Sequence, residues 1–178
     1  MEGNRAGRGG GITARLEPLT PADFASAGVL ARTIWHAHYD PLIGAAQVDY
    51  MLDRRFTEAN LAAYVEASDR GFDLLHDGEA LIGYCSYGPS GAPGELKLEQ
   101  LYLLPERHGR GLGRLMLTHV ESRAQALGCD RIMLMVAKAN TGSQAVYARA
   151  GFTVREPVMM DIGGGYVMDD YVMEKRLG

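Results

Sequence analysis

The sequence predicts an α/β (α+β) fold, in which one mixed sheet carries helices on both of its faces. Segments with strand-like and helix-like spacing of apolar residues follow one another in the order strand, helices, three strands, helix, strand, helix and two strands. Asp77-Gly78, between two apolar runs, is the strongest hairpin pattern in the chain. The run 131–137 is almost continuously apolar, which is typical of a strand covered on both faces.

The chain opens with a short strand and a long helix. Residues 12–16 are the strand candidate. A helix is predicted from Thr20 and Pro21 onward, because they provide a capping hydroxyl and a proline at the first helical position, and Asp23 adds an acid in the first turn. Apolar residues at helical spacing extend this helix to about Tyr39.

Two short helices and three strands follow. One helix lies around 48–52, and Thr57 caps the next. The strands are 72–76 and 80–87, which form the hairpin, and 95–104. We expect these three strands to be neighbours in the sheet.

The second half of the chain alternates helices and strands. Apolar positions recur at helical spacing after Gly111 and stop at Gly128, a residue type that commonly follows a helix end. A glycine-rich turn over 163–165 joins the last two strands. The elements are, in order, a helix over 111–127, a strand over 131–137, a helix over 141–150, and strands over 153–161 and 170–175.

Length and composition limit the kind of protein. The 178 residues suffice for one domain, which we place over 11–178 behind a flexible N-terminal tail over 1–10. The net charge of −4 argues against a nucleic-acid partner, which would need a clustered basic face. No stretch approaches the ~20 apolar residues of a membrane-spanning helix, and the N-terminus lacks the apolar core of a secretory signal. We therefore expect a cytoplasmic protein with neither a nucleic-acid nor a membrane partner.

The cysteines and histidines indicate neither a disulfide nor a metal site. Cys85 and Cys129 lie beside apolar runs and are interpreted as small core residues, with a disulfide as the less favoured alternative. His36 and His38 are too close in sequence to share a helical face, so we predict no metal ion.

A glycine-rich loop joins the strand 95–104 to the helix that follows it. The sequence R-H-G-R-G-L-G over 107–113 has glycine at alternate positions, which lets the backbone curl so that successive N–H groups point into one concavity. The helix start adds unpaired N–H groups and the positive end of its dipole. Arg110 and Arg114 add charge-assisted donors. The loop therefore predicts an anion site suited to a pyrophosphate.

Two common nucleotide-binding loops do not fit this segment. The lysine of the Walker loop is absent, and the glycine spacing differs from that of the dinucleotide-binding fingerprint. Nucleotide hydrolysis is therefore not predicted.

The segment around the loop resembles that of a known family. The run E-L-K-L-E-Q-L-Y-L-L-P-E-R-H-G-R-G-L-G, residues 95–113, closely resembles the coenzyme A-binding segment of the GNAT superfamily of N-acetyltransferases. The family signature is Gln or Arg, two residues, Gly, one residue, then Gly or Ala, and Gly111 and Gly113 match it. His108 stands at the Gln/Arg position, a departure that leaves the backbone N–H groups of the loop intact.

A second match lies downstream. Asn140, Tyr147 and Gly151-Phe152 look like the family's Asn…Ala-x-x-Tyr…Gly-Phe segment. The resemblance covers about residues 72–176 well and the helical front of the chain more loosely.

The resemblance implies a GNAT-type fold with a mostly antiparallel, twisted sheet of about six to seven strands that is splayed at the cofactor site. It also implies acetyl-CoA as the co-substrate, with no metal. The residues expected to contact it are Leu101, Tyr102, Leu103, His108, Gly109, Arg110, Gly111, Leu112, Gly113, Arg114, Asn140, Ser143 and Tyr147.

The resemblance further implies two groups that act during the reaction, one on the thiolate that leaves and one on the oxyanion that develops. Tyr147 would donate a proton to the coenzyme A thiolate as it leaves, which suits a phenol of pKa about 10 and a thiol of pKa about 8.5. The alternative is an aromatic core residue on an amphipathic helix. The backbone N–H of Leu103 would donate to the developing oxyanion.

A carboxylate is expected to accept the proton of the amine. Glu99 is the first candidate, because strand alternation places it on the face of Leu101 and Leu103. A rim carboxylate that merely attracts a cationic substrate is the alternative role. Glu95 and Asp169 are the alternative bases.

The acceptor is expected to be the primary amine of a small molecule, which attacks the thioester directly. Segments 34–39, 49–52 and 98–103 and the end of the chain resemble the spermine/spermidine branch of the family. Acids over 161–170 would attract a polycation, or they face water in a solvated hairpin. The residues expected to bind the acceptor are Trp35, Tyr39, Glu99 and Asp169.

Two other functions remain open at this point. The first is acetylation of protein N-termini or lysines, which predicts an open groove for the acceptor. The second is a catalytically idle coenzyme A-binding module, which would have no need of Tyr147 or Glu99. A homodimer is a candidate assembly, since symmetric dimers are common among small enzymes.

Overall fold

The computed structural model describes residues 13–178. The flexible tail predicted over 1–10 and the first residue of the predicted strand 12–16 lie outside the described residues.

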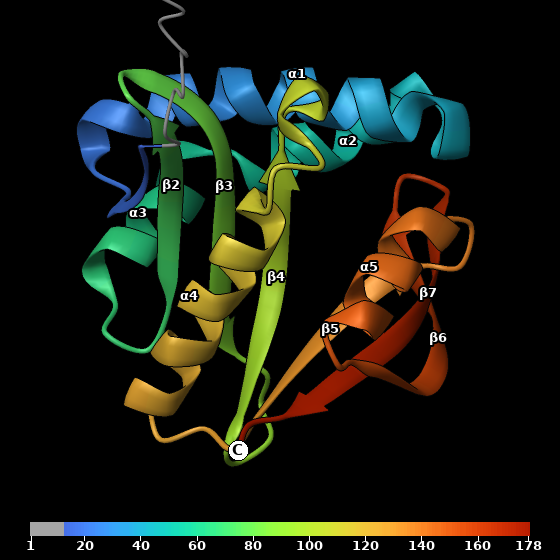
Figure 1. Cartoon of the computed structure of the whole chain (residues 1–178). Coiled ribbons are helices and arrows are strands. Elements are labelled where there is room, and N and C mark those ends of the chain that lie inside the picture. The colour runs from blue at the N-terminus through green and yellow to red at the C-terminus, as the bar shows by residue number, and fades with distance from the viewer. Residues whose placement is uncertain (1–12) are drawn as a thin grey trace, which may run out of the picture.

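Seven strands form one sheet in the order β1-β2-β3-β4-β5-β7-β6 (Figure 1). All neighbouring pairs are antiparallel except β4 and β5, which run parallel. The mixed, mostly antiparallel sheet of about six to seven strands is therefore confirmed. The strands are β1 (Ala14–Pro18), β2 (Gly71–Asp77), β3 (Ala80–Pro89), β4 (Glu95–Leu103), β5 (Arg131–Ala137), β6 (Thr153–Gly163) and β7 (Tyr166–Arg176).

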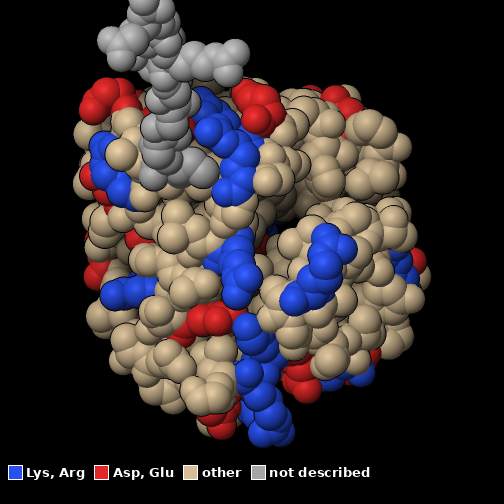
Figure 2. Space-filling model, in the orientation of Figure 1, with Lys and Arg blue, Asp and Glu red and all other residues tan. Residues whose placement is uncertain are grey.

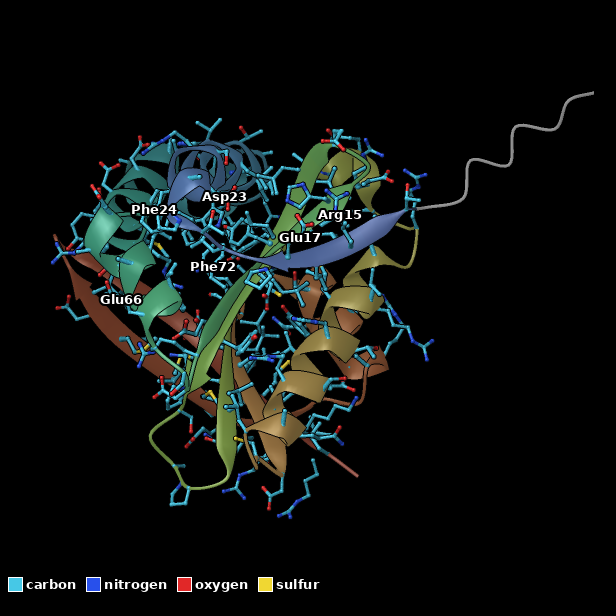
Figure 3. All side chains as sticks on the ribbon, turned by 90° about the vertical axis from the view of Figure 1, so that its left-hand side faces the viewer. Arg15, Glu17, Asp23, Phe24, Glu66 and Phe72 are labelled. Carbon is cyan, nitrogen blue, oxygen red and sulfur yellow. The ribbon has the colours of Figure 1, made fainter. Side chains whose placement is uncertain are left out.

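Helices cover both faces of the sheet, as predicted. The helices α1, α2 and α3 pack on one face, and α4 and α5 lie on the other (Figure 1). Figure 3 shows the sheet from its edge, with β1 in front and the two groups of helices on opposite sides. The helices are η1 (Pro21–Asp23), α1 (Phe24–Ile43), α2 (Ala45–Arg55), α3 (Glu58–Glu66), η2 (Pro105–Arg107), α4 (Leu112–Ala126) and α5 (Thr141–Arg149).

Each face has its own apolar core. On the α1 face, Phe72, labelled in Figure 3, stacks on Tyr84 at 5.3 Å between ring centroids. On the α4 face, Met116 and Val120 of α4 are fully buried against the strands. The two cysteines are free, and Cys85 is buried in this second core. Because both of its faces are covered, β5 is almost continuously apolar, as the sequence predicted.

The sheet opens between β4 and β5. These strands pair only over 95–98 and 131–134, although β4 continues to Leu103 and β5 to Ala137. On its other side β4 pairs with β3, and the register shifts so that Ser86 faces Gln100 while Tyr87 faces Leu98. Glu99 is therefore the extra residue of a β-bulge, which bends a strand and increases its twist. The bulge coincides with the point where β4 leaves β5, and the splayed sheet that we expected is observed.

Two elements extend further than the sequence predicts. The helix α1 continues beyond Tyr39 through Pro41 to Ile43. Pro41 cannot donate a backbone hydrogen bond to the preceding turn, but a bond from the Gly44 N–H to the Asp40 carbonyl oxygen closes the last turn at 3.0 Å. The strand β7 begins at Tyr166 and not at 170. The turn itself consists only of Gly164 and Gly165, both with positive φ, so pairing resumes immediately after it, between Gly163 and Tyr166.

Candidate active site

The glycine-rich loop forms an open concavity at the start of α4. Gly109 and Gly111 have φ values of 75° and 77°, in the left-handed region that glycine adopts readily, and Gly111 is the N-cap of α4. A Cβ placed on Gly109, Gly111 or Gly113 meets nothing within 4 Å. The two turns therefore need glycine for their backbone angles, and the space in front of all three residues is free for a ligand.

Positive charge surrounds this concavity. Arg110 and Arg114 are exposed, and neither has an ion-pair partner among the described residues. The first turn of α4 contains no acid, so Arg114 lies near the positive end of the helix dipole without compensation. Figure 2 shows Lys and Arg side chains in a band down the middle of this face, with a hollow beside its upper part. A bound anion relieves this accumulation of charge, so the concavity fits a pyrophosphate.

The opened edge of β4 lies next to the loop. The N–H of Leu104 donates to the carbonyl oxygen of Ile82 on β3 at 2.9 Å. Because N–H groups alternate in direction along a strand, those of Leu101 and Leu103 point away from β3, toward the side that β5 has left. The Leu103 N–H is therefore directed into the opening, where we expected it.

His108 contacts β4. Its Nε2 donates to the carbonyl oxygen of Leu103 at 3.0 Å, an arrangement that assigns the proton to Nε2. The side chain ties the loop to the strand and satisfies the Leu103 carbonyl while the N–H of that residue stays directed into the opening. The side chain of Leu112 is buried, so only its backbone is available to a ligand at the start of α4.

Tyr147 lies on α5, on the same face of the sheet as the loop. The ring is half-buried and packs edge-on against Phe152, with centroids 5.7 Å apart, beside the core that includes Leu103. Burial, with a smaller contribution from Tyr39, raises the pKa of the Tyr147 hydroxyl. The hydroxyl therefore keeps its proton at neutral pH, as a proton donor requires.

Asn140 connects the two faces of the sheet across the opening. Its Oδ1 accepts a hydrogen bond from the Ser143 N–H at 3.1 Å and so caps α5. Its Nδ2 then donates to Nε2 of His38, on α1, at 2.9 Å. Burial, together with the charge of His108, lowers the pKa of His38, which accordingly stays neutral and accepts this bond. His38 is a site residue that the sequence analysis did not identify.

The comparison with protein families agrees with this geometry. Residues 32–152 match the family model described as the acetyltransferase (GNAT) family. The chain belongs to the GNAT family of acetyltransferases. A relative from Mycobacterium tuberculosis, named an uncharacterized N-acetyltransferase, is 30% identical over 160 residues, which cover 89% of this chain and 99% of that protein. A mycothiol acetyltransferase of Geodermatophilus obscurus is 33% identical over 88 residues, which cover 47% of this chain but 29% of that protein.

Solved structures of GNAT acetyltransferases share the fold. The PaiA N-acetyltransferase from Thermoplasma acidophilum, solved in complex with coenzyme A, superposes with a TM-score of 0.80 at 21% identity, over 93% of this chain and all of that one. A GCN5-related N-acetyltransferase from Rhodopseudomonas palustris gives a TM-score of 0.76 at 18% identity, covering 93% of this chain and 96% of that one. At these identities the likeness supports the fold alone.

In this acetyltransferase Glu99 faces the α1 side, which corrects one expectation. Its Oε2 accepts a hydrogen bond from the hydroxyl of Tyr64 on α3, whereas the side chains of Leu101 and Leu103 pack on the α4 face. The bulge adds one residue to the strand, so the alternation assumed from the sequence is reversed at Glu99. Burial, together with the Glu99 carboxylate, raises the pKa of Tyr64 to about 12.

Two of the other expected acids lie elsewhere. Glu95 is 5% exposed and pairs with Arg131 at 3.2 Å and Arg155 at 2.8 Å at the start of β4, so it holds strands together and lies away from the opening. Asp169 is exposed and pairs with Lys138 at 2.5 Å. Both were alternative bases, and Asp169 was also expected to bind the acceptor; the structure supports neither role.

Asp170, and not Asp169, faces the α1 side of the sheet, which we call the acceptor side because Trp35 and Tyr39, the residues expected to bind the acceptor, belong to α1. Side chains alternate along β7, so Asp170 shares the face of Met168, opposite to Asp169. The residue is 2% exposed, and its carboxylate forms no hydrogen bond or ion pair with the described residues. Burial and the charge of Asp169 raise the pKa of Asp170. Asp170 also raises the pKa of Tyr39, which places the two groups within electrostatic reach of each other.

Tyrosines line the α1 side of the opening. The hydroxyls of Tyr39 and Tyr102 lie 2.9 Å apart, so Tyr102, expected to contact the co-substrate, presents its side chain on the acceptor side. Trp35, expected to bind the acceptor, is 2% exposed and donates from Nε1 to the Tyr84 hydroxyl at 2.8 Å. Trp35 therefore lies on the buried face of α1, behind Tyr39 and Tyr102, and is not exposed to an acceptor as we expected.

A cavity of about 390 Å³ lies on this acceptor side, between α2, α3 and the β6–β7 hairpin. Tyr64, which holds Glu99, forms part of its wall, and Met168 lines it from β7. A larger cavity of about 680 Å³ lies between α1 and α2, and none of its lining residues belongs to β4 or β5. The smaller cavity has no lining residue from these strands either, but Tyr64 in its wall holds Glu99, at the bulge of β4, and so connects this cavity to the opening.

Two further features are absent from the part of the chain that the structure describes. Within 13–178, no group of three or more His, Cys, Asp or Glu side chains is arranged to hold a metal ion. No helix of the described part of the chain is long and apolar enough to cross a membrane.

Several site residues carry no pattern that sequence alone reveals. Tyr64 and Arg55 occupy ordinary positions on helices that the sequence predicts, and their approach to the opening depends on how α2 and α3 pack. The Oε1 of Gln100, next to the bulge, is a buried oxygen without a hydrogen-bond partner among the described residues. Asp170 carries no such pattern either, because it is the first residue of the strand predicted over 170–175 and Met168 lies before that strand.

Proposed function

We propose that the protein transfers the acetyl group of acetyl-CoA to the primary amine of a small molecule, by direct attack of the amine on the thioester. The observation that carries this proposal is the opening between β4 and β5. The glycine loop and Tyr147 lie beside it on the α4 face, and on the α1 face the acceptor cavity is connected to it through Tyr64, which holds Glu99. Coenzyme A fits the first side, because the loop offers N–H groups, two arginines and free space.

The residues of the opening divide the chemistry among them. Acetyl-CoA supplies the acetyl group as an activated thioester. The N–H of Leu103 donates a hydrogen bond to the thioester carbonyl oxygen, where negative charge develops. Tyr147 gives its phenolic proton to the departing sulfur, and its raised pKa ensures that the proton is present at neutral pH.

The amine must lose a proton during the reaction, and Glu99 is the proposed acceptor. Its carboxylate lies on the acceptor side and Tyr64 fixes one of its oxygens, so the other is available to the amine, directly or through a water molecule. The sequence also led us to expect Glu99 as the base, but on the face of Leu101 and Leu103, whereas it lies on the opposite face of β4.

Thiol release from acetyl-CoA tests the proposal, measured with a panel of amines, amino acids, polyamines and short peptides. Tyr147→Phe should lower kcat by about a hundredfold or more, as the loss of a general acid does, and leave coenzyme A affinity unchanged. Tyr171→Phe is the matched control: this tyrosine is also half-buried, and its hydroxyl has no hydrogen-bond partner among the described residues, so activity should be retained.

Three other outcomes would contradict the proposal. Full activity of Tyr147→Phe removes the assigned proton donor. Turnover restricted to peptides identifies a protein acetyltransferase. No turnover on any acceptor, with tight coenzyme A binding, indicates an idle binding module.

A further inference from the structure

We propose that the acceptor amine carries an anionic group, a carboxylate or a phosphate, which arginines at the mouth of the acceptor cavity bind while the amine lies toward Asp170. This inference rests on the proposed function and specifies the chemical class of the amine that accepts the acetyl group. It differs from the polyamine branch that the sequence resembles.

Three arginines line the cavity. Arg54 and Arg55 come from the end of α2, and Arg70 precedes β2. Among the described residues that line the cavity, none is an aspartate or a glutamate. A bound polyamine would bring its additional ammonium groups toward these guanidinium groups, whereas a carboxylate or a phosphate would find charge-assisted donors there.

The guanidinium groups retain free donors. Arg55 forms no hydrogen bond or ion pair from its side chain within residues 13–178. Arg54 donates to the Tyr50 hydroxyl at 2.7 Å and lies over that ring, with its Cζ 4.8 Å from the ring centroid, so it is held in place without a carboxylate partner. Arg70 uses Nε for Asp69 at 3.2 Å, which leaves its terminal nitrogens available.

The charge of Arg55 acts on the interior of the site. It lowers the pKa values of four hydroxyls on the α1 face, those of Tyr39, Tyr64, Tyr84 and Tyr102, against the larger effect of burial. Tyr39 and Tyr102 lie at the opening and Tyr64 holds Glu99, so the guanidinium is close enough to influence a ligand there. Arg55 is itself exposed, so a ligand can reach its guanidinium from solvent, while water weakens part of its effect on the interior.

The inner end of the site carries acidic residues, whose charge is opposite to that of the arginines. Met168 lines the cavity, and Asp170 follows on the same face of β7, buried and without a hydrogen-bond partner among the described residues. A second carboxylate, that of Glu99, is held by Tyr64 in the cavity wall. An acceptor with an ammonium at one end and an anion at the other matches this order of charges.

The walls of the cavity are fixed to one another, so the charges keep their positions. The Tyr50 hydroxyl donates to the carbonyl oxygen of Ile162 at 3.0 Å, and Nε2 of Gln47 donates to the Val167 carbonyl oxygen at 3.3 Å. These bonds join α2 to the β6–β7 hairpin. A preformed pair of opposite charges can select ligands by the distance between their charged groups.

Matched acceptor pairs test the inference. Acetyl transfer is measured with β-alanine against propylamine, 4-aminobutyrate against butylamine, and O-phosphoethanolamine against ethanolamine, with spermidine as the polycation. We expect the anionic member of at least one pair to have the higher kcat/KM by about tenfold or more, the value of one charge-assisted bond. The carboxylate and phosphate pairs separate the two anions.

Arg55→Gln should raise KM for the preferred anionic acceptor by about tenfold and leave its neutral partner within about twofold. Arg176→Gln, at the other end of β7, is the matched control and should change neither value. Melting-temperature shifts caused by the anionic acceptor alone, without acetyl-CoA, should also decrease in Arg55→Gln.

The outcomes separate this inference from the proposed function. Equal or better turnover of neutral amines or spermidine, with no effect of Arg55→Gln, overturns the inference and leaves acetyl transfer intact. A wild-type protein that acetylates no amine, including spermidine, overturns the proposed function itself and the inference with it.

Discussion

Asp170 carries a carboxylate that folding removes almost entirely from water. Ionised groups in such a position disfavour folding unless they are paired, and no described residue pairs with this one. The adjacent Asp169 differs in each respect, since it is exposed and bonded to Lys138. The sequence-based choice was Asp169, and in a strand a difference of one residue changes the face of the sheet.

Asp170→Asn should therefore separate binding from stability. The pKa of Asp170 is raised, so the unfolded chain releases this proton at a lower pH than the folded protein, and stability falls as the pH rises from the ordinary carboxyl pKa through the folded value. At pH 7 the substitution should raise the melting temperature, while KM for the amine rises about tenfold.

Asp169→Asn is the control for this experiment, with KM expected within about twofold of the wild type. Calorimetry and steady-state kinetics on the same preparations give both values. A lower melting temperature with unchanged KM for Asp170→Asn would show that the carboxylate is structural and does not meet the amine.

At the scale of elements, the turn into α4 shows what spacing alone can reveal. Glycines at alternate positions predicted an anion cradle, and the structure places Gly109 and Gly111 at positive φ with open space in front of them. Local backbone preferences decide such a turn, so the sequence contains the information. The bulge at Glu99 is different, because it depends on the pairing of β4 with β3, which no local pattern records.

Gly111→Ala and Gly113→Ala should have opposite effects on stability. Gly111 has positive φ, so a side chain there costs about 1–2 kcal/mol. Gly113 lies in the first turn of α4 with no positive φ and no neighbour within 4 Å of a Cβ, so alanine should stabilise the helix by up to about 1 kcal/mol.

Both substitutions should raise KM for acetyl-CoA, because each alters the cradle: the first changes the direction of its N–H groups and the second places a methyl group in the open space. Denaturant unfolding and kinetics with saturating amine measure the two effects. If Gly113→Ala leaves KM for acetyl-CoA unchanged, the phosphate groups do not lie against this residue.

At the scale of the whole molecule, the local distribution of charge says more about which ligands can bind than the net charge does. The net charge of −4 led us to expect no anionic macromolecule as partner, and it says nothing of small anions. Within the fold, arginines gather both at the glycine loop and at the mouth of the acceptor cavity, on opposite faces of the sheet. Composition could not predict this, because the arginines of α2 and the loop before β2 meet only after α2, α3 and the β6–β7 hairpin pack.

The two faces of the molecule are joined across the opening by the bond from Asn140 to His38, and this connection should make stability depend on pH. Burial and His108 lower the pKa of His38 below its ordinary value of 6.5. The unfolded chain therefore binds this proton at a higher pH than the folded protein, and stability falls as the pH decreases below about 6.5. His38→Gln keeps an acceptor for Asn140 but does not titrate, so the loss of melting temperature between pH 7.5 and pH 5.5 should be smaller than in the wild type. Equal losses in the two proteins would show that the contact between α1 and α5 does not limit stability.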